Sequence, residues 1–270
     1  MLLRSGMYGI PVPESELPES IDWKAVLALA QQHAVVGTII NSVQFLPDSL
    51  RPSASTSAKM NKFALGLIQT NMVLDRTAAR LVAFLEQHGI RGVLLKGQGV
   101  ARYYPMPQIR QTGDIDFYVG REQYRRAVEV CREQLASDKV ECEEMEVHFS
   151  FDMGGVEIEL HRLAAKIYSP VRNRRFRHWV VEELEHSGAR RSLQLGDTEV
   201  VLPSYEFDAL FIFYHAWHHY LTGGIGLRQL CDWAMIFHSH SADIAREQLT
   251  ANLRRFGLTN GWKLFACIAV

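Results

Sequence analysis

Residues 93–119 read VLLKGQGVARYYPMPQIRQTGDIDFYV, and the two strands predicted in this stretch define the centre of the fold. The pattern predicts, in order, a strand over 93–95, a break at 96–99, a helix over 100–104, a polar loop over 110–113 and a second strand over 114–119. A short apolar run such as VLL is typical of a strand buried on both faces. Pro105 and Pro107 end the helix, because proline has no N–H to donate to a helical hydrogen bond.

The second strand carries two carboxylates on one face. Side chains alternate along a strand, so Asp114 and Asp116 point the same way, roughly 6–7 Å apart. They repel each other unless a cation lies between them, and hard oxygen ligands on a rigid element suit Mg²⁺ together with substrate phosphates. Backbone N–H groups of the break at 96–99 can donate to phosphate oxygens, and Lys96 or Arg110 would neutralise the phosphates further.

Four short motifs in this region carry a resemblance: Leu94-Leu95-Lys96-Gly97, Tyr104-Pro105, Arg110 and Gly113-Asp114-Ile115-Asp116. Together they resemble the nucleotidyltransferase superfamily of the polymerase-β type, whose fingerprint is a strand, a Gly-Gly or Gly-Ser turn, a helix and Asp-x-Asp. The narrower likeness is to a bacterial branch with an LLKG…YP…R…GDID pattern and covers residues 90–161. The sequence departs from relatives at Gln98, where many carry Ser or Gly, and in the long loop before the aspartates.

The resemblance implies an α+β fold, with a nucleotidyltransferase-like mixed β-sheet core of four or five strands and flanking N- and C-terminal helices. On this basis the chain divides into an N-terminal helical region over 1–88, a nucleotidyltransferase core over 89–202 and a C-terminal helical region over 203–270.

The resemblance also implies a reaction, in which a nucleoside monophosphate, with AMP as the first choice, passes from an NTP to an acceptor and pyrophosphate is released. The residues that would bind the nucleotide phosphates are Lys96, Gly97, Gln98, Gly99 and Arg110. The residues that would be catalytic and hold two Mg²⁺ (or Mn²⁺) ions are Asp114, Asp116 and Glu159.

Glu159 enters this set through the strand predicted over 156–161, on which Glu157, Glu159 and His161 share one face. In the resembled superfamily a neighbouring strand supplies a third carboxylate, and relatives place an acidic residue two positions before a His. Glu159 is therefore the choice, with Glu157 in reserve, and its role would be general base. The alternative is a half-exposed edge strand whose charged residues face solvent.

The composition limits the class of protein. The chain has 270 residues, 47% of them hydrophobic, and a formal net charge of −1, which indicates a globular protein with a sizeable core. A net charge near zero gives no global attraction to nucleic acid, so such a partner is left open and not favoured. The four cysteines are predicted to be buried free thiols in a reducing compartment: Cys131, Cys142, Cys231 and Cys267.

The sequence shows neither a signal peptide nor an apolar run long enough to span a bilayer, so no membrane partner is predicted and the cytoplasm is the expected location. The apolar end over 267–270 lacks a helix stop, which suggests a truncated chain or a buried terminus.

Outside the central stretch, periodicity and turn residues predict the remaining elements. They are an irregular segment over 1–20, helices over 21–43, 57–88, 121–135, 203–221 and 227–237, strands over 139–151 and 156–161, a hairpin over 192–202, and two closing helices. The expected N-caps are Asp22 and Ser204. The expected buried side chains of the long helix are Phe63, Leu67, Met72, Leu74, Leu81, Val82 and Leu85.

Two further features have alternative interpretations. The basic run RNRRFRH at 172–178 is predicted to be a solvated surface loop, the alternative being a polyanion site with Phe176 stacking on a base. Arg228 and Asp232 are four residues apart and are predicted to pair along one helix. The alternative is a role in the pocket, because the resembled branch often shows such an Arg-x-x-x-Asp pattern after a helix that contains histidine.

Two other functions compete with the transferase. One is a non-catalytic nucleotide-binding or regulatory protein of the same fold. The other is a zinc-dependent hydrolase, because His215 and His219 have the spacing that chelates zinc on a helix; packing or acceptor binding is favoured for these residues and for His218. The acceptor itself is left open between a small molecule, a sugar, a protein and an RNA end.

Overall fold

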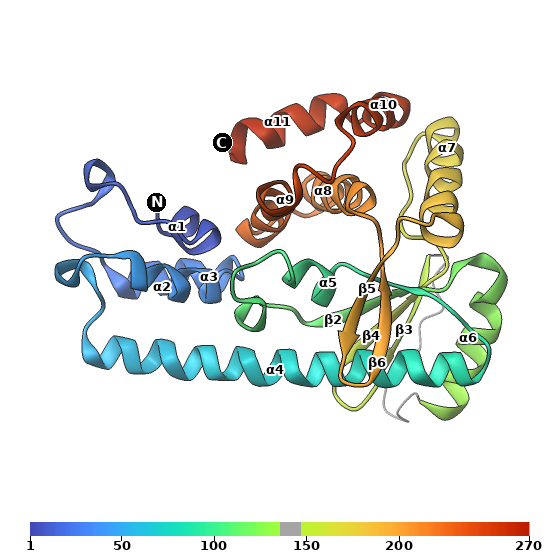
Figure 1. Cartoon of the computed structure of the whole chain (residues 1–270), viewed down its shortest axis with the longest axis horizontal. Helices are drawn as coiled ribbons and strands as arrows, with labels where there is room; N and C mark the ends of the chain where they lie inside the picture. The colour runs from blue at the N-terminus through green and yellow to red at the C-terminus, as the bar shows by residue number, and fades with distance from the viewer. Residues whose placement is uncertain (136–146, 270) are drawn as a thin grey trace.

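The computed structural model describes residues 1–135 and 147–269, and a mixed sheet lies at their centre. Its strands are β1 (Val93–Leu95), β2 (Asp114–Tyr118), β3 (His148–Asp152) and β4 (Glu157–His161), in the spatial order β1-β2-β4-β3. β2 is antiparallel to β1 and parallel to β4, whereas β3 is antiparallel to β4. Helices flank the sheet in sequence and in space, so the predicted α+β class is confirmed (Figure 1).

The sheet has one apolar and one charged face, because apolar and acidic residues alternate along β2 and β4. Ile115, Phe117 and Ile158 pack in one core with the C-terminal half of α4 (Ala54–Gln87) and with α6 (Gly120–Gln134). The carboxylates between them point to the opposite face. Figure 1 shows α4 running below the sheet and the helices α8 (Tyr205–Thr222) and α9 (Leu227–His240) lying above it.

A second core joins the two ends of the chain. Phe211 and Trp233 from α8 and α9 belong to the same buried cluster as Trp23 and Val36 from the N-terminal helices. Three further helices also contribute buried residues to this cluster: α7 (Pro170–Val181), α10 (Arg246–Phe256) and α11 (Thr259–Ala269). The described part of the chain holds no helix with both the length and the apolar character needed to cross a membrane.

The N-terminal segment differs from the prediction. Residues 1–20 contain the helix α1 (Leu2–Tyr8) and the short turn η1 (Glu14–Glu16), so the expectation of an irregular lead-in was wrong. The apolar face of α1 was too short to recognise by periodicity, but its contact with α3 (Val36–Ser42) buries it. The helix predicted over 21–43 is two helices, α2 (Trp23–Gln32) and α3, because Ala34 between them has a left-handed backbone with φ of 55°.

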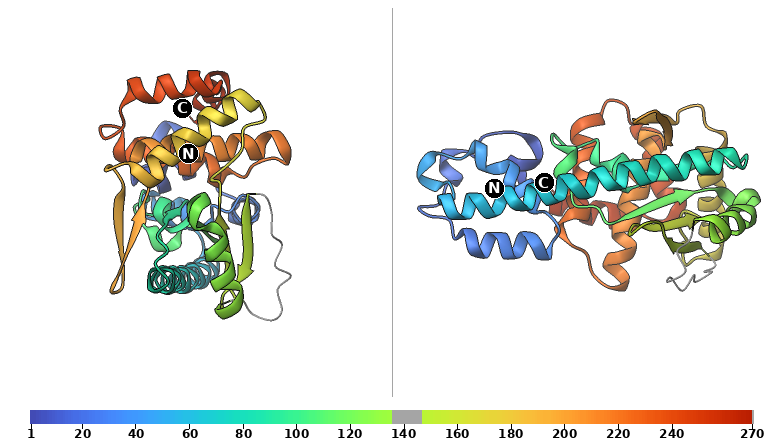
Figure 2. Two further views of the ribbon diagram at one scale, coloured as in Figure 1. Left: turned by 90° about the vertical axis from the view of Figure 1, so that its right-hand side faces the viewer. Right: turned by 90° about the horizontal axis from the view of Figure 1, so that it is seen from below.

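The long helix α4 begins three residues earlier than predicted, with Ser53 as its N-cap. Its predicted buried set holds for Leu74, Leu81, Val82 and Leu85, which lie over the sheet, and Leu67 is partly buried. Phe63 and Met72 are exposed, contrary to the prediction. For Phe63 the reason is that the N-terminal half of α4 extends past the sheet beneath α2 and α3 (Figures 1 and 2), so fewer of its residues have a packing partner.

The C-terminal half of the core follows the prediction more closely. The hairpin predicted over 192–202 forms as β5 (Arg191–Leu195) and β6 (Thr198–Leu202), and the predicted N-caps Asp22 and Ser204 accept backbone hydrogen bonds. Residues 136–146 lie outside the described residues, so the strand predicted over 139–151 is seen only from His148 onward. The predicted break at 96–99 is largely helical, because the short helix α5 (Gly97–Ala101) starts at Gly97 instead of at residue 100.

Two surface predictions need correction. The basic run 172–178 lies on helix α7 instead of in a loop, and Phe176 is fully buried in the core, where it cannot stack on a base. Cys131 and Cys231 are buried free thiols as predicted, but Cys267 is exposed, and Cys142 lies outside the described residues.

Close packing at Gly37 gives a stability prediction. A Cβ added there would lie 1.8 Å from the carbonyl oxygen of Ile109, so Gly37→Ala must displace α3 from the loop that leads to β2. We expect a loss of about 1–3 kcal/mol in the free energy of unfolding, the usual cost of overpacking. The matched control is Gly66→Ala in the exposed part of α4, where nothing lies within 4 Å. There alanine should add about 0.5–1 kcal/mol through helix propensity, and urea denaturation measures both.

Candidate active site

The charged face of the sheet gathers the predicted carboxylates. Asp116 lies opposite Glu159 on the parallel strands β2 and β4, and Asp114 lies opposite Glu157. Opposed residues in a ladder point to the same face, which places these side chains side by side. Asp116 is buried, Asp114 and Glu159 are partly exposed, and Glu157 is exposed. The geometry therefore groups Asp114, Asp116 and Glu159 and leaves Glu157 nearest to solvent.

Lys96 lies against this group. It follows β1 directly, and its Nζ is 2.7 Å from Asp116 Oδ1. Its backbone has φ of 49° and ψ of −138°, a conformation that costs a non-glycine residue on the order of 1–3 kcal/mol. Such strain is found mostly at functional sites. The chain thus keeps a lysine in an unfavourable conformation at the point where its ammonium meets the buried aspartate.

The two aspartates of the GDID motif differ in charge compensation. Although burial alone would raise it, Lys96 and the hydrogen bond from His161 Nε2, at 2.8 Å, hold the pKa of Asp116 far below its usual range. The pKa of Asp114 is raised, first by burial and then by repulsion from Asp116 and Glu159, against which Lys96 acts only in part. The site therefore holds more negative charge than its own cations neutralise.

Two histidines of α8, His215 and His219, extend the line of polar contacts that starts at Asp116 and Lys96. Lys96 Nζ is 3.1 Å from His215 Nε2, which in turn is 3.2 Å from His219 Nε2. An ammonium can only donate, so His215 Nε2 accepts from Lys96 and its proton lies on Nδ1. Burial and the neighbouring Lys96 lower the pKa of both histidines, which keeps both neutral.

Arg110 lies beside Lys96 and the aspartates, in a buried ion pair with Asp232. Its Nε and Nη2 donate to the two carboxylate oxygens of Asp232 at 2.8 and 2.6 Å, and Tyr104 Oη donates to the same carboxylate at 2.7 Å. The third nitrogen, Nη1, donates to the carbonyl of Gly97 and to Thr112. The guanidinium of Arg110, one of the groups predicted to bind phosphate, is therefore already used within the fold.

The predicted pair of Arg228 with Asp232 was wrong, because Arg110 takes the carboxylate. Arg228 Nη1 instead donates to the carbonyl of Gln111 at 3.0 Å, and its Nε is buried without a hydrogen-bond partner among the described residues. Arg228 also lines a hollow of about 60 Å³ together with Lys96, Thr112, Asp114 and Asp116. A volume of this size holds cations or water and is far below the 300–1,000 Å³ of a site for a whole small ligand.

The three residues Gly97, Gln98 and Gly99 of the predicted break contact three different parts of the structure. Gly97 has a left-handed backbone with φ of 38° and lies next to Thr112 and the carbonyl of Asp114, at the hollow. The Gln98 side chain points to α4, where it donates to Asp75 and to the carbonyl of Asn71. Gly99 packs against Leu202 of β6, which an added Cβ would approach to 3.0 Å.

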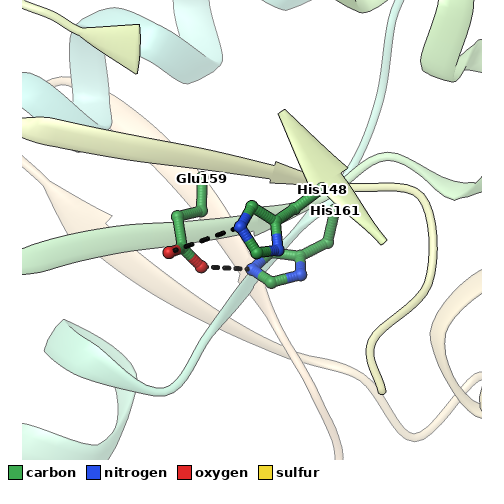
Figure 3. A group of neighbouring side chains, drawn as sticks. All are labelled: His148, Glu159 and His161. Carbon is green, nitrogen blue, oxygen red and sulfur yellow. Dashed lines mark ion pairs between the residues drawn. The ribbon is translucent and has the colours of Figure 1, made fainter. Parts of the chain in front are cut away.

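Figure 3 shows two histidines on the other side of Glu159. His161 Nε2, from β4, lies 3.2 Å from Glu159 Oε2, and His148 Nε2, from β3, lies 3.8 Å from Glu159 Oε1. Alternation along β4 predicted that His161 shares a face with Glu159. The position of His148 depends on the antiparallel register of β3 with β4, which pairs His148 with His161 and which we did not infer from the sequence.

The strand, turn, short helix and strand with paired aspartates, together with an acidic residue on the next strand, define the nucleotidyltransferase superfamily fold. A family model described as "Uncharacterised nucleotidyltransferase" matches residues 19–270, and the chain belongs to this family. The protein is also similar to a solved structure, an antigenic nucleotidyltransferase-like protein from Paracoccidioides brasiliensis. That similarity has 14% identity and a TM-score of 0.40, and covers 70% of this chain and 92% of the other. No curated protein matches the chain.

Proposed function

We propose that the chain transfers a nucleoside monophosphate from an NTP to an acceptor with release of pyrophosphate, and that ATP is the first donor to test. The observation that carries the proposal is the excess negative charge where Asp114, Asp116 and Glu159 meet, in a family of nucleotidyltransferases. Neighbouring carboxylates that raise a pKa by mutual repulsion are typical of functional sites.

The donor set fits Mg²⁺ or Mn²⁺. Asp114, Asp116 and Glu159 offer hard carboxylate oxygens from two hydrogen-bonded strands, and their repulsion is relieved by a divalent cation. When bound, such ions would neutralise charge that develops on the transferred and leaving phosphate groups.

The protein's own groups have distinct roles in this proposal. Lys96 keeps its ammonium beside Asp116 and, with His215 as its second acceptor, has one further N–H to donate to a phosphate oxygen at the hollow. Asp116 is a poor proton acceptor because its pKa is held so low. Glu159, which is partly exposed, is the candidate general base for the acceptor. The base and sugar of the nucleotide would lie outside the small hollow.

Among the predicted phosphate ligands, Arg110 is better replaced by Arg228. Both arginines line the hollow, but the guanidinium of Arg110 is held by Asp232, whereas Arg228 has a buried Nε without a partner among the described residues. A phosphate oxygen would satisfy that N–H. Lys96 and Gly97 remain proposed phosphate contacts, and so do Gln98 and Gly99 through their backbone.

Arg228→Ala is expected to raise the KM for the NTP by about 10–100-fold, the equivalent of one or two charge-assisted hydrogen bonds, with a smaller change in kcat. Arg228→Lys should restore part of the loss, because it keeps the charge. Steady-state kinetics with varied NTP tests this, and Arg174→Ala on exposed α7 is the control. An unchanged KM in Arg228→Ala would remove Arg228 from the site.

The direct test uses each of the four NTPs labelled at the α-phosphorus, with Mg²⁺ and with pools of small molecules, proteins including the chain itself, and RNA. We expect label to pass to one pool with equimolar release of pyrophosphate. Saturable NTP binding with neither label transfer nor pyrophosphate release would favour the alternative, a non-catalytic nucleotide-binding protein of the same fold.

The zinc hydrolase built on His215 and His219 gains no support. Lys96 donates to His215 Nε2 and so occupies the lone pair that zinc would need. Among residues 1–135 and 147–269, no third His, Cys or carboxylate gathers with these two histidines as a ligand set.

A further inference from the structure

The outer half of the charged sheet face carries a ligand set of a different chemical kind. His148 comes from the edge strand β3, and Glu159 and His161 come from β4 beside it. Figure 3 shows the two imidazoles turned toward the two oxygens of the Glu159 carboxylate. One ligand atom from each residue lies within 4.8 Å of the other two.

These separations suit a single bound cation. Zn²⁺ binds imidazole nitrogen and carboxylate oxygen at about 2.0–2.2 Å, which sets neighbouring ligand atoms of a tetrahedral site roughly 3.3–3.6 Å apart. The Glu159 carboxylate has one oxygen 3.2 Å from His161 Nε2 and the other 3.8 Å from His148 Nε2, close to that spacing, and a small side-chain adjustment would bring one ligand atom of each residue onto a shared ion. All three residues lie on hydrogen-bonded strands, so their backbones are held in place before any ion binds.

The donor types select the class of ion. Mg²⁺ takes oxygen ligands and keeps much of its water, whereas imidazole nitrogen suits Zn²⁺ and other divalent transition metals. Two histidines with one carboxylate leave a fourth position open for water or substrate. We propose that His148, Glu159 and His161 bind one divalent transition-metal ion, with Zn²⁺ as the representative, at the outer edge of the charged face.

The accessibility and the sheet order support this placement. His148 and Glu159 are each 22% exposed, so an ion reaches the set from solvent, while His161 forms its 6% exposed floor. Lys96 contacts Asp116 from the β1 side of the sheet, and β3 lies at the opposite edge. The ammonium and the metal ion would therefore lie on opposite sides of Asp116. Binding requires His161 Nε2 to release to solvent the proton that it donates to Asp116.

This inference shares Glu159 with the proposed transferase site but stands without it, because it concerns metal binding in the absence of nucleotide. The experiment uses the full chain with any affinity tag removed and stripped of metal with a chelator. Zn²⁺ binding is measured by equilibrium dialysis against millimolar Mg²⁺, and Co²⁺ absorption bands report the ligand set. We expect one Zn²⁺ per chain, not displaced by Mg²⁺.

His148→Ala is the main variant, because His148 is partly exposed and its loss should leave the fold intact, which circular dichroism checks. We expect at least tenfold weaker Zn²⁺ binding and altered Co²⁺ bands, since even loss of a residue that supports a ligand costs about 10–100-fold. The exposed His186→Ala is the matched control and should bind like the wild type. Asp114→Asn should also keep Zn²⁺ while losing the proposed transferase activity, which separates the two proposals. Failure of the wild type to bind Zn²⁺, its displacement by Mg²⁺, or unchanged binding in His148→Ala would overturn the inference.

Discussion

Asp114→Asn and Asp116→Asn are each expected to lower nucleotide transfer by at least about 10²–10³-fold, the usual cost of removing one group that stabilises transition-state charge. Both substitutions keep the side-chain size and remove one negative charge from the set that would hold Mg²⁺. The two variants should nevertheless differ in stability, because the fold compensates the two charges differently.

Asp114 is destabilised by burial and by its acidic neighbours, so Asp114→Asn should leave the free energy of unfolding unchanged or raise it in metal-free buffer. Asp116 is the partner of the Lys96 ammonium and of His161, both largely buried. Asp116→Asn leaves these groups poorly compensated and should lower the free energy of unfolding by about 3–5 kcal/mol. A loss of function without a loss of stability in Asp114→Asn is the signature of a binding site.

Pyrophosphate release with the identified acceptor measures the activity, and urea denaturation in EDTA measures the stability. Asp197→Asn, in the exposed turn between β5 and β6, makes the same chemical change away from the site and should alter neither quantity. Full activity in Asp114→Asn would refute the proposed carboxylate site, and equal stability losses in both variants would refute the difference in charge compensation.

Asp232→Ala is expected to lower the free energy of unfolding by about 3–5 kcal/mol, because it leaves a buried guanidinium without its counter-ion. Arg110 and Asp232 are only 6% and 8% exposed and meet at 2.6 Å. The same change removes the acceptor of the buried Tyr104 hydroxyl. The loss would loosen α9 from the loop that precedes β2, since the ion pair connects them.

Urea denaturation of Asp232→Ala and of the double variant Arg110→Met/Asp232→Leu tests this explanation. The double variant should be clearly more stable than Asp232→Ala, because no buried charge is left alone. Asp48→Ala breaks the exposed pair with Arg51, and it should change stability by less than about 1 kcal/mol. A small effect of Asp232→Ala would show that water reaches Arg110 and that the pair is not a structural anchor.

Local pattern was sufficient for elements whose burial follows from nearby residues. The strands over 114–119 and 156–161 were predicted within one residue at either end, because period-2 alternation directly reflects one buried and one polar face. The same rule placed Asp114, Asp116 and Glu159 on the polar side. Helical periodicity was not sufficient at α1 or at Phe63 and Met72 of α4, because the burial of these residues depends on which distant segment covers them.

The family motif predicted residue types without assigning their partners. Lys96 and Arg110 were interchangeable cations in the sequence, yet one contacts the buried Asp116 and the other is held by Asp232, more than 120 positions along the chain. No sequence pattern indicated that His148 lies beside Glu159, because its position depends on the register of β3 with β4.

The sequence by itself therefore determined most of the strands and helices and the charged face of the sheet, since periodicity and turn residues act over short distances, and its motifs supplied the resemblance that implied the nucleotidyltransferase fold. Only the tertiary structure decided which cation faces Asp116, which arginine pairs with Asp232 and which histidines surround Glu159. These choices depend on contacts between segments far apart in the chain, and the burial that makes each contact strong exists only once those segments have packed together.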